Sequence, residues 1–326
     1  MAQLQTEPDT PGTWDTTTAS WLPIHMTTQD GLRLSGRHYP APRSSRRAVV
    51  CLAGLTRNVR DFDRVAAALS SGPHARDVYC LDMRGRGGSD HDTDWRNYTV
   101  LVEMFDVQDF MTVFGLHDVA LIGTSRGGLI GMGLAATQPT RLGAIVLNDI
   151  GPVIEPSGLA RISGYVGQTP VPATWDEAIA LCRKLAGPDF PDVDDAEWAA
   201  VARQWFNEEN GHPAVSYDPD LAKSFLESKS GIPDLWPLFG ALKRVPCLTL
   251  RGALSDLFSE ATLDAMAQKH PRFRSHTVPR QGHAPLLRDP ETIEVISTFL
   301  RSADLTSADA PTETIQRNDT GLDQAS

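Results

Sequence analysis

The sequence of 326 residues has few cysteines, and their positions narrow the classes of protein to which it can belong. Its four cysteines form no Cys-x-x-Cys pair, so neither a zinc site nor a disulfide framework is indicated. Three of them lie inside apolar runs, where buried free thiols are common. We therefore expect no bound metal and a reducing, cytoplasmic location for the cysteines, which are Cys51, Cys80, Cys182 and Cys247.

Long apolar runs and excess positive charge are also missing. No run approaches the ~20 apolar residues of a membrane span, and the first 20 residues lack the basic start and apolar centre of a signal peptide. The formal net charge is -11, which argues against a nucleic-acid partner because phosphate binding needs a basic surface. The glycine spacings of phosphate-binding loops are absent too, although residues 82–90, DMRGRGGSD, hold three glycines. The sequence thus favours no nucleic acid, no membrane and no cofactor.

What the chain does have is an alternation of short apolar runs with helical patterns. Runs of four to six apolar residues without polar alternation are typical of strands buried on both faces, and helical segments between them indicate parallel crossovers. The fold class is therefore predicted to be α/β, with a doubly wound, mostly parallel sheet. An antiparallel hairpin over 24–39, with Asp30-Gly31 as its turn, precedes the predicted strands in 47–54, 77–82, 118–123, 143–149 and 247–252.

The segment from 151 to 235 interrupts this alternation. It is rich in proline and in helix signals, such as the capping box of Thr174 and Glu177. We interpret 151–235 as a helical cap inserted into a core, although two ordinary crossover helices with long loops are the alternative. The core is then 21–150 and 236–302, the first 20 residues are a loose leader, and 303–326 are a polar, disordered tail.

A serine stands where the apolar run VALIG turns into a helical pattern. Gly123, Ser125 and Gly127 read G-x-S-x-G, and a strand-to-helix turn this sharp needs glycine two residues before and after the serine. The turn projects the hydroxyl at the carboxyl end of the strand, where the following helix also points its free N–H groups. A helix cap with small neighbours is the alternative interpretation of the same residues.

A serine hydroxyl needs a base to act as a nucleophile, and the base needs an orienting group. His283 follows a strand-like run and a glycine, and Asp256 lies in the loop after the preceding strand. Because the carboxyl ends of parallel strands share one edge, we expect Ser125, His283 and Asp256 to meet there. Asp149 also ends a strand, but we expect it to make a structural hydrogen bond at the junction with the cap.

These motifs resemble the α/β-hydrolase superfamily over about residues 24 to 300. The resemblance rests on CLAGLTRN (51–58), DMRGRGGSD (82–90), GTSRGG (123–128) and the late SD…GH pair. It implies that Ser125 is the nucleophile, His283 the base and Asp256 its orienter. It also implies an oxyanion hole made by the backbone N–H groups of Leu55 and Arg126.

A serine nucleophile in this superfamily implies acyl chemistry. We expect a cofactor-free serine hydrolase that cleaves a carboxylic ester, lactone or thioester of a small-molecule acyl substrate through an acyl-enzyme intermediate. A carbon–carbon bond hydrolase with the same triad, or a binding protein that keeps the pocket without catalysis, are the alternatives.

Four further residues are candidates for binding the substrate. Arg57 and Asn58 flank the expected oxyanion loop, and the alternative is that they hold this loop in place by hydrogen bonds. Trp175 and Trp205 are expected either to line an apolar pocket or to form the core of the cap itself.

Overall fold

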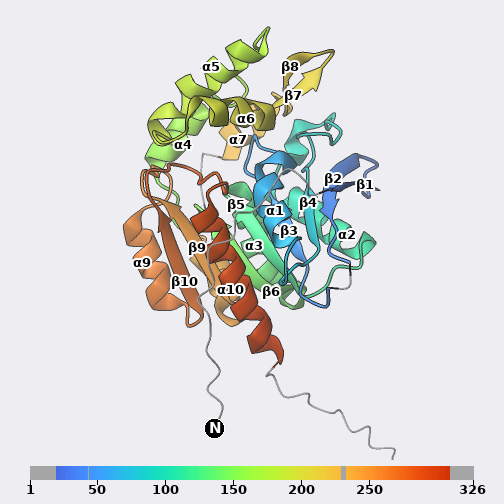
Figure 1. Ribbon diagram of the computed structural model, residues 1–326, viewed down its shortest axis with the longest axis vertical. Coiled ribbons are helices and arrows are strands. Elements are labelled where there is room, and N and C mark those ends of the chain that lie inside the picture. Colours follow the sequence, from blue (N-terminus) through green and yellow to red (C-terminus); the bar gives the residue numbers. More distant parts are fainter. Residues whose placement is uncertain (1–19, 43, 229–232, 309–326) are drawn as a thin grey trace, which may run out of the picture.

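An eight-stranded sheet forms the centre of the computed structural model, which describes residues 20–42, 44–228 and 233–308 (Figure 1). The strand order is β1-β2-β4-β3-β5-β6-β9-β10. β2 pairs antiparallel with both β1 and β4, and all other neighbours are parallel. The strands are β1 (Leu22–Thr27), β2 (Arg33–Tyr39), β3 (Val49–Leu52), β4 (Val78–Leu81), β5 (Val119–Thr124), β6 (Leu142–Asn148), β9 (Cys247–Gly252) and β10 (Phe273–Val278).

Helices cover both faces of this sheet (Figure 1). One face packs against side chains of α2, α3, α8 and α9, and the other against α1 and α10. These helices are α1 (Asp63–Leu69), α2 (Val100–Val113), α3 (Arg126–Thr137), α8 (Trp236–Ala241), α9 (Glu260–Lys269) and α10 (Pro290–Ala308). Short 3₁₀ turns are η1 (Val59–Phe62), η2 (Trp95–Asn97), η3 (Pro139–Arg141), η4 (Gly187–Asp189) and η5 (Leu242–Arg244).

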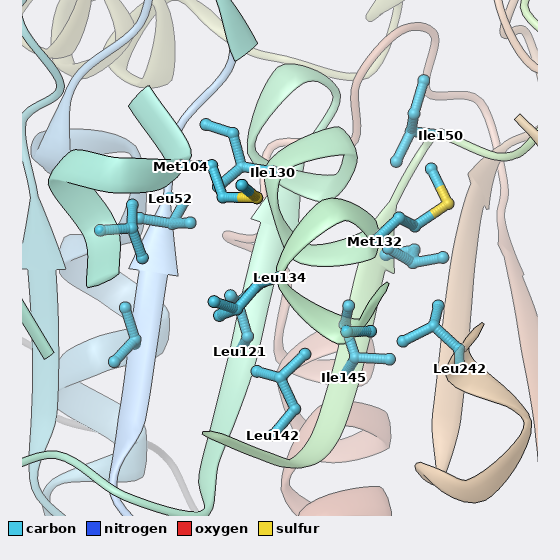
Figure 2. Close-up of a cluster of buried hydrophobic side chains, with 14 of the residues drawn as sticks. Leu52, Met104, Leu121, Ile130, Met132, Leu134, Leu142, Ile145, Ile150 and Leu242 are labelled. Atoms are coloured by element: carbon cyan, nitrogen blue, oxygen red, sulfur yellow. The ribbon is translucent and has the colours of Figure 1, made fainter. Parts of the chain in front are cut away.

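The central strands are buried on both faces, as their uninterrupted apolar runs predict. Along β3 and β5, Leu52 and Leu121 face one hydrophobic cluster, whereas Cys51 and Ile122 face the other. Figure 2 shows the first cluster, in which side chains of α3 interdigitate with those of the strands. The predicted doubly wound, mostly parallel sheet is confirmed, and all four cysteines are buried free thiols.

Residues 151–228 and 233–235, here called the cap, lie beyond one end of the sheet (Figure 1). The helical pattern of residues 194–211 predicts one helix, but in the structure the helix ends at Trp205 and a β-hairpin follows. Asn210 and Gly211 both have positive φ, which is the hairpin-turn conformation that an Asn-Gly pair favours. The cap contains α4 (Pro156–Ser163), α5 (Trp175–Ala186), α6 (Asp195–Trp205), β7 (Phe206–Glu209), β8 (His212–Val215) and α7 (Leu221–Ser228).

The last helix also differs from its predicted end. α10 continues to Ala308 instead of ending at 302, because Ala303 is buried against the sheet and extends the packed face of the helix. The rest of the predicted tail and the leader, except Ser20, lie outside the described residues. Within the parts that the structure describes, every helix is too short or too polar to cross a membrane.

Helix α3 begins directly against the sheet because two glycines remove the side chains that would block it. A Cβ atom added to Gly127 would lie 2.2 Å from the carbonyl oxygen of Leu52 on β3. A Cβ added to Gly123 would lie 2.6 Å from the backbone of Gly127. Both contacts are with backbone atoms, which cannot rotate away.

Replacing Gly127 by alanine should therefore destabilise the protein strongly. We expect Gly127→Ala to lower the free energy of unfolding by about 3 kcal/mol or more, because overpacking against backbone forces the helix off the sheet. Gly240→Ala in α8 is the matched control, since its added Cβ would meet nothing within 4 Å. That change should alter stability by no more than about 1 kcal/mol. Equal urea-unfolding midpoints for Gly127→Ala and wild type would contradict the contact.

Candidate active site

Ser125 occupies a strained turn between β5 and α3. Its φ of 50° and ψ of -111° put a non-glycine residue in the left-handed half of backbone space, a conformation that is costly and concentrated at functional sites. The Ser125 N–H donates to the carbonyl of Asn148 on β6 at 3.0 Å, which holds the turn against the neighbouring strand. The predicted strand–turn–helix geometry of the G-x-S-x-G motif is present.

The Ser125 hydroxyl lies against a histidine. Ser125 Oγ is 3.0 Å from His283 Nε2, within hydrogen-bonding distance. His283 comes from the loop that follows β10, and its side chain is only 7 % exposed. The sequence thus predicted correctly that these two residues meet at the carboxyl ends of the strands.

The other nitrogen of this histidine contacts Asp149. His283 Nδ1 is 2.7 Å from Asp149 Oδ2. The Asp149 carboxylate is fully buried, and it also accepts hydrogen bonds from Gly252 N at 2.8 Å and from Ser255 Oγ at 2.6 Å. These two donors fix the carboxylate in place, so a hydrogen-bonded relay runs from Asp149 through His283 to Ser125.

The predicted contact between Asp256 and His283 is wrong. The Asp256 carboxylate instead accepts two hydrogen bonds from Arg161 of the cap, both at 2.7 Å. The reason lies in the loops, because β6 and β9 both lie between β5 and β10. Asp149 follows the end of β6 directly and is held there by Gly252 and Ser255. Asp256 follows the end of β9 by four residues, which brings it to α4 instead.

The backbone N–H groups of Leu55 and Arg126 both belong to segments beside Ser125. A Cβ added to Gly54 would lie 3.8 Å from the Cβ of Ser125, so the loop after β3 runs next to the serine. Arg126 is the first residue of α3. Within the described residues no backbone carbonyl accepts a hydrogen bond from either N–H group. Both donors are therefore available to a ligand.

A cavity of about 150 Å³ opens onto Ser125 and His283 between the core and the cap. This volume is enough for a small organic ligand. Among the residues that the structure describes, no three His, Cys, Asp or Glu side chains are grouped so as to hold a metal ion. The apolar side chains on the cavity wall include Leu55, Ile162, Leu181, Leu185, Phe190, Trp205 and Leu286.

Two of the four residues predicted to bind substrate lie on this cavity. Arg57 and Trp205 line it, and the Arg57 guanidinium stacks 4.1 Å from the centre of the Trp205 ring. Arg57 also forms two hydrogen bonds with Asp61, at 2.8 and 2.5 Å. A cation that is both paired and stacked has a fixed orientation at the cavity wall.

The other two residues lie elsewhere, so their predicted contact with substrate is not supported. Asn58 is fully buried, and its Nδ2 donates to the carbonyl of Gln204 at 2.9 Å, which ties the core to the cap. Trp175 packs within the cap and donates from Nε1 to the carbonyl of Gly211 at 3.2 Å. Both are structural residues, the second of the two alternatives that the sequence left open.

Sequence reasoning missed two charged residues of the cap that line the cavity. Arg161, from α4, reaches Asp256, and the Asp189 carboxylate lies 3.7 Å from the Arg161 guanidinium. Hydrogen bonds from Arg161 hold the pKa of Asp256 below its usual value, whereas burial raises the pKa of Asp189. No motif marks either residue, because their position depends on how the cap folds over the sheet.

Comparison with known proteins shows the family to which the chain belongs. Residues 49–295 match the sequence model of the alpha/beta hydrolase family. The chain is 33 % identical over 282 residues to the 3-hydroxybutyrate-oligomer hydrolase of Cupriavidus necator, an alignment that covers 84 % of this chain and 94 % of the relative.

Solved structures of similar proteins share this fold. The crystal structure of an alpha/beta hydrolase from Novosphingobium aromaticivorans superposes with a TM-score of 0.81 at 40 % identity, covering 87 % of this chain and 99 % of that one. E-2-(acetamidomethylene)succinate hydrolase, at 20 % identity, shares the fold with a TM-score of 0.73 over 86 % of this chain and 100 % of its own.

The relay predicts where a serine-reactive probe will attach. An alkyl fluorophosphonate should label Ser125 and no other serine, because His283 can accept its proton. Asp149→Asn should slow labelling by at least about tenfold, whereas Asp256→Asn should leave the rate within about twofold, since only Asp149 contacts the histidine. Peptide mass spectrometry gives the site and a time course gives the rate. Labelling that slows in Asp256→Asn but not in Asp149→Asn would refute the relay.

Proposed function

We propose that this chain, which belongs to the alpha/beta hydrolase family and is an enzyme of the hydrolase class, cleaves small carboxylic esters through Ser125, His283 and Asp149. The observation that carries the proposal is the continuous hydrogen-bonded relay, at 3.0 Å from Ser125 to His283 and 2.7 Å from His283 to Asp149. A serine with such a relay is suited to acyl transfer.

In the first half of the proposed cycle, Ser125 Oγ attacks the ester carbonyl and His283 Nε2 accepts the serine proton. The Asp149 carboxylate, which is held by Gly252 and Ser255, orients the imidazole and stabilises the imidazolium that forms. The tetrahedral intermediate then collapses, and the leaving alcohol takes the proton from His283. The acyl group stays on Ser125 as an ester.

The second half of the cycle regenerates the enzyme. His283 removes a proton from a water molecule, which attacks the acyl carbonyl, and the proton returns to Ser125 as the carboxylic acid departs. In both halves the N–H groups of Leu55 and Arg126 would donate to the negatively charged oxygen. One such donor can be worth about 3 kcal/mol of transition-state stabilisation.

For the substrate we propose short esters of hydroxy acids. The Cupriavidus necator relative is named for hydrolysis of 3-hydroxybutyrate oligomers, and the alignment covers 84 % of this chain and 94 % of the relative. The cavity is small, and its wall combines apolar side chains with two arginine–aspartate pairs, Arg57 with Asp61 and Arg161 with Asp189. These features fit a short acyl chain with polar groups better than a long lipid.

The same three residues are also suited to cleaving a carbon–carbon bond beside a ketone, which is the second reaction type to test. A panel of short hydroxy-acid dimers, simple esters, lactones and a vinylogous diketone separates the two reactions. We expect the highest kcat/KM for the hydroxy-acid dimers. Turnover of the diketone alone would overturn the ester assignment.

Substitutions in the proposed triad should lower turnover by amounts that depend on the role of each residue. On an ester substrate we expect Ser125→Ala to lose essentially all activity and Asp149→Asn to lower kcat by ~10³ to 10⁴, because the histidine loses its orienting carboxylate. Stopped-flow and steady-state kinetics on purified variants measure both effects.

Asp256→Asn is the matched control for this series, because it removes a carboxylate from the same end of the sheet. We expect its kcat to stay within about threefold of wild type, since Asp256 contacts neither reacting side chain. A large loss of kcat in Asp256→Asn with normal activity in Asp149→Asn would show that the acid is assigned to the wrong residue.

A further inference from the structure

A buried carboxylate that takes no part in the relay lies behind the proposed oxyanion hole. Glu103, on α2, is fully buried and uses both of its carboxylate oxygens. Its Oε1 accepts from Arg86 Nη1 at 2.6 Å, and its Oε2 accepts from Arg126 Nε at 2.6 Å. A second bond from Arg126 Nη2 to Oε1, at 3.1 Å, completes the bridge between the two arginines.

Each arginine is in turn connected to one of the two N–H donors. Arg86 Nε donates to the carbonyl of Leu55 at 2.8 Å, and so holds the backbone of the loop that follows β3. Arg126 carries the other donor on its own backbone, and its side chain is held by Glu103 and by the carbonyl of Tyr98 at 2.8 Å. Glu103 is therefore the link between two segments that the sheet brings together from different strands.

The energetics of this cluster favour a role beyond stability. Burial by itself raises the pKa of Glu103, but Arg126 and Arg86 outweigh it, so the pKa is lowered and the residue is charged at neutral pH. The desolvation cost of a buried ion pair offsets much of the attraction between its charges, and apolar residues of similar volume often stabilise a fold equally well. A bidentate, charge-assisted bridge does, however, fix the geometry of its partners more tightly than apolar contacts do.

We propose that Glu103 is a positioning residue, which holds the N–H donors of Leu55 and Arg126 in the fixed arrangement that receives the charged oxygen. This inference rests on the proposed function, because it needs Ser125 to form a tetrahedral intermediate. It assigns a role in catalysis to a helix that contributes no side chain to the cavity wall.

A purely electrostatic role for the three charged side chains predicts that loss of the Glu103 charge raises the rate, whereas the positioning role predicts that it lowers the rate. Two arginines and one glutamate give a net charge of +1 near the developing negative oxygen. Removing the negative charge of Glu103 would raise that net charge and favour the transition state, if the field alone mattered. If Glu103 acts by position, removing the bridge lowers the rate. The sign of the effect therefore separates the two roles.

The test is Glu103→Gln, whose amide cannot accept hydrogen bonds from both arginines with both of its terminal atoms. We expect kcat to fall about 10- to 100-fold with KM changed by less than about threefold, because a donor displaced by ~1 Å loses much of its worth. Affinity for a trifluoromethyl ketone, whose serine adduct carries a charged oxygen, should fall in parallel with kcat/KM. Titration with a fluorophosphonate counts the folded sites, so a loss of folded protein is not mistaken for a slower reaction.

Asp106→Asn is the matched control on the same helix. Asp106 is 3 % exposed and forms two 2.7 Å hydrogen bonds with Arg84. The substitution therefore removes a buried ion pair comparable to that of Glu103. Arg84 does not hold the Leu55 carbonyl. We expect Asp106→Asn to reduce stability by a similar amount while leaving kcat and ketone affinity within about twofold per folded site.

Arg86→Lys provides a second variant if Glu103→Gln fails to fold. Lysine keeps the charge, but its single ammonium cannot bond Leu55, Arg84 and Glu103 in the geometry of a guanidinium, so we expect about a tenfold loss of kcat. Unchanged kcat and ketone affinity in Glu103→Gln, or in Arg86→Lys where only that variant folds, would overturn the positioning role. Full activity of Ser125→Ala would instead overturn the proposed function on which this role rests.

Discussion

The close approach of α3 to β3 is the constraint on which the rest of the site depends. Because Gly127 has no Cβ, the helix can start against the carbonyl of Leu52, and this forces Ser125 into its strained turn. The same approach brings the loop after β3, with Gly54 and Leu55, beside the serine. This one backbone contact brings Ser125 and the two candidate N–H donors together, and the side-chain bridge from Arg86 through Glu103 to Arg126 then holds the two donor segments.

The neighbouring strands supply the other reacting groups by the same principle. β6 runs beside β5 and ends at Asp149, and His283 follows the edge strand β10, so the parallel sheet delivers acid, base and nucleophile to one edge. The cap closes this edge from above and adds Arg161, whose pair with Asp256 joins α4 to the core. The core therefore brings the relay together, and side chains of both core and cap line the cavity beside it.

Features of the site that depend on a few neighbouring residues could be predicted from the sequence, whereas features that depend on packing between distant segments could not. The fold class, the turn at Ser125 and the meeting of Ser125 with His283 could be predicted, because strand periodicity and the glycine spacing act over a few residues. The choice between Asp149 and Asp256 could not be predicted, because β6 and β9 both lie between β5 and β10, and it is the course of the loop after β9 that pairs Asp256 with Arg161 of the cap. Asn58 is placed by a contact between core and cap, and Trp175 by packing within the cap, and no sequence period encodes either contact.

The central claim is that Ser125 carries the acyl group during turnover, and trapping that intermediate tests it most directly. Wild-type protein mixed with p-nitrophenyl butyrate and quenched in acid during the first turnover should gain the mass of one butyryl group. Peptide mapping should place that group on Ser125, and Ser125→Ala should gain none. Release of p-nitrophenol with no covalent adduct, or with the adduct on another residue, would contradict the account.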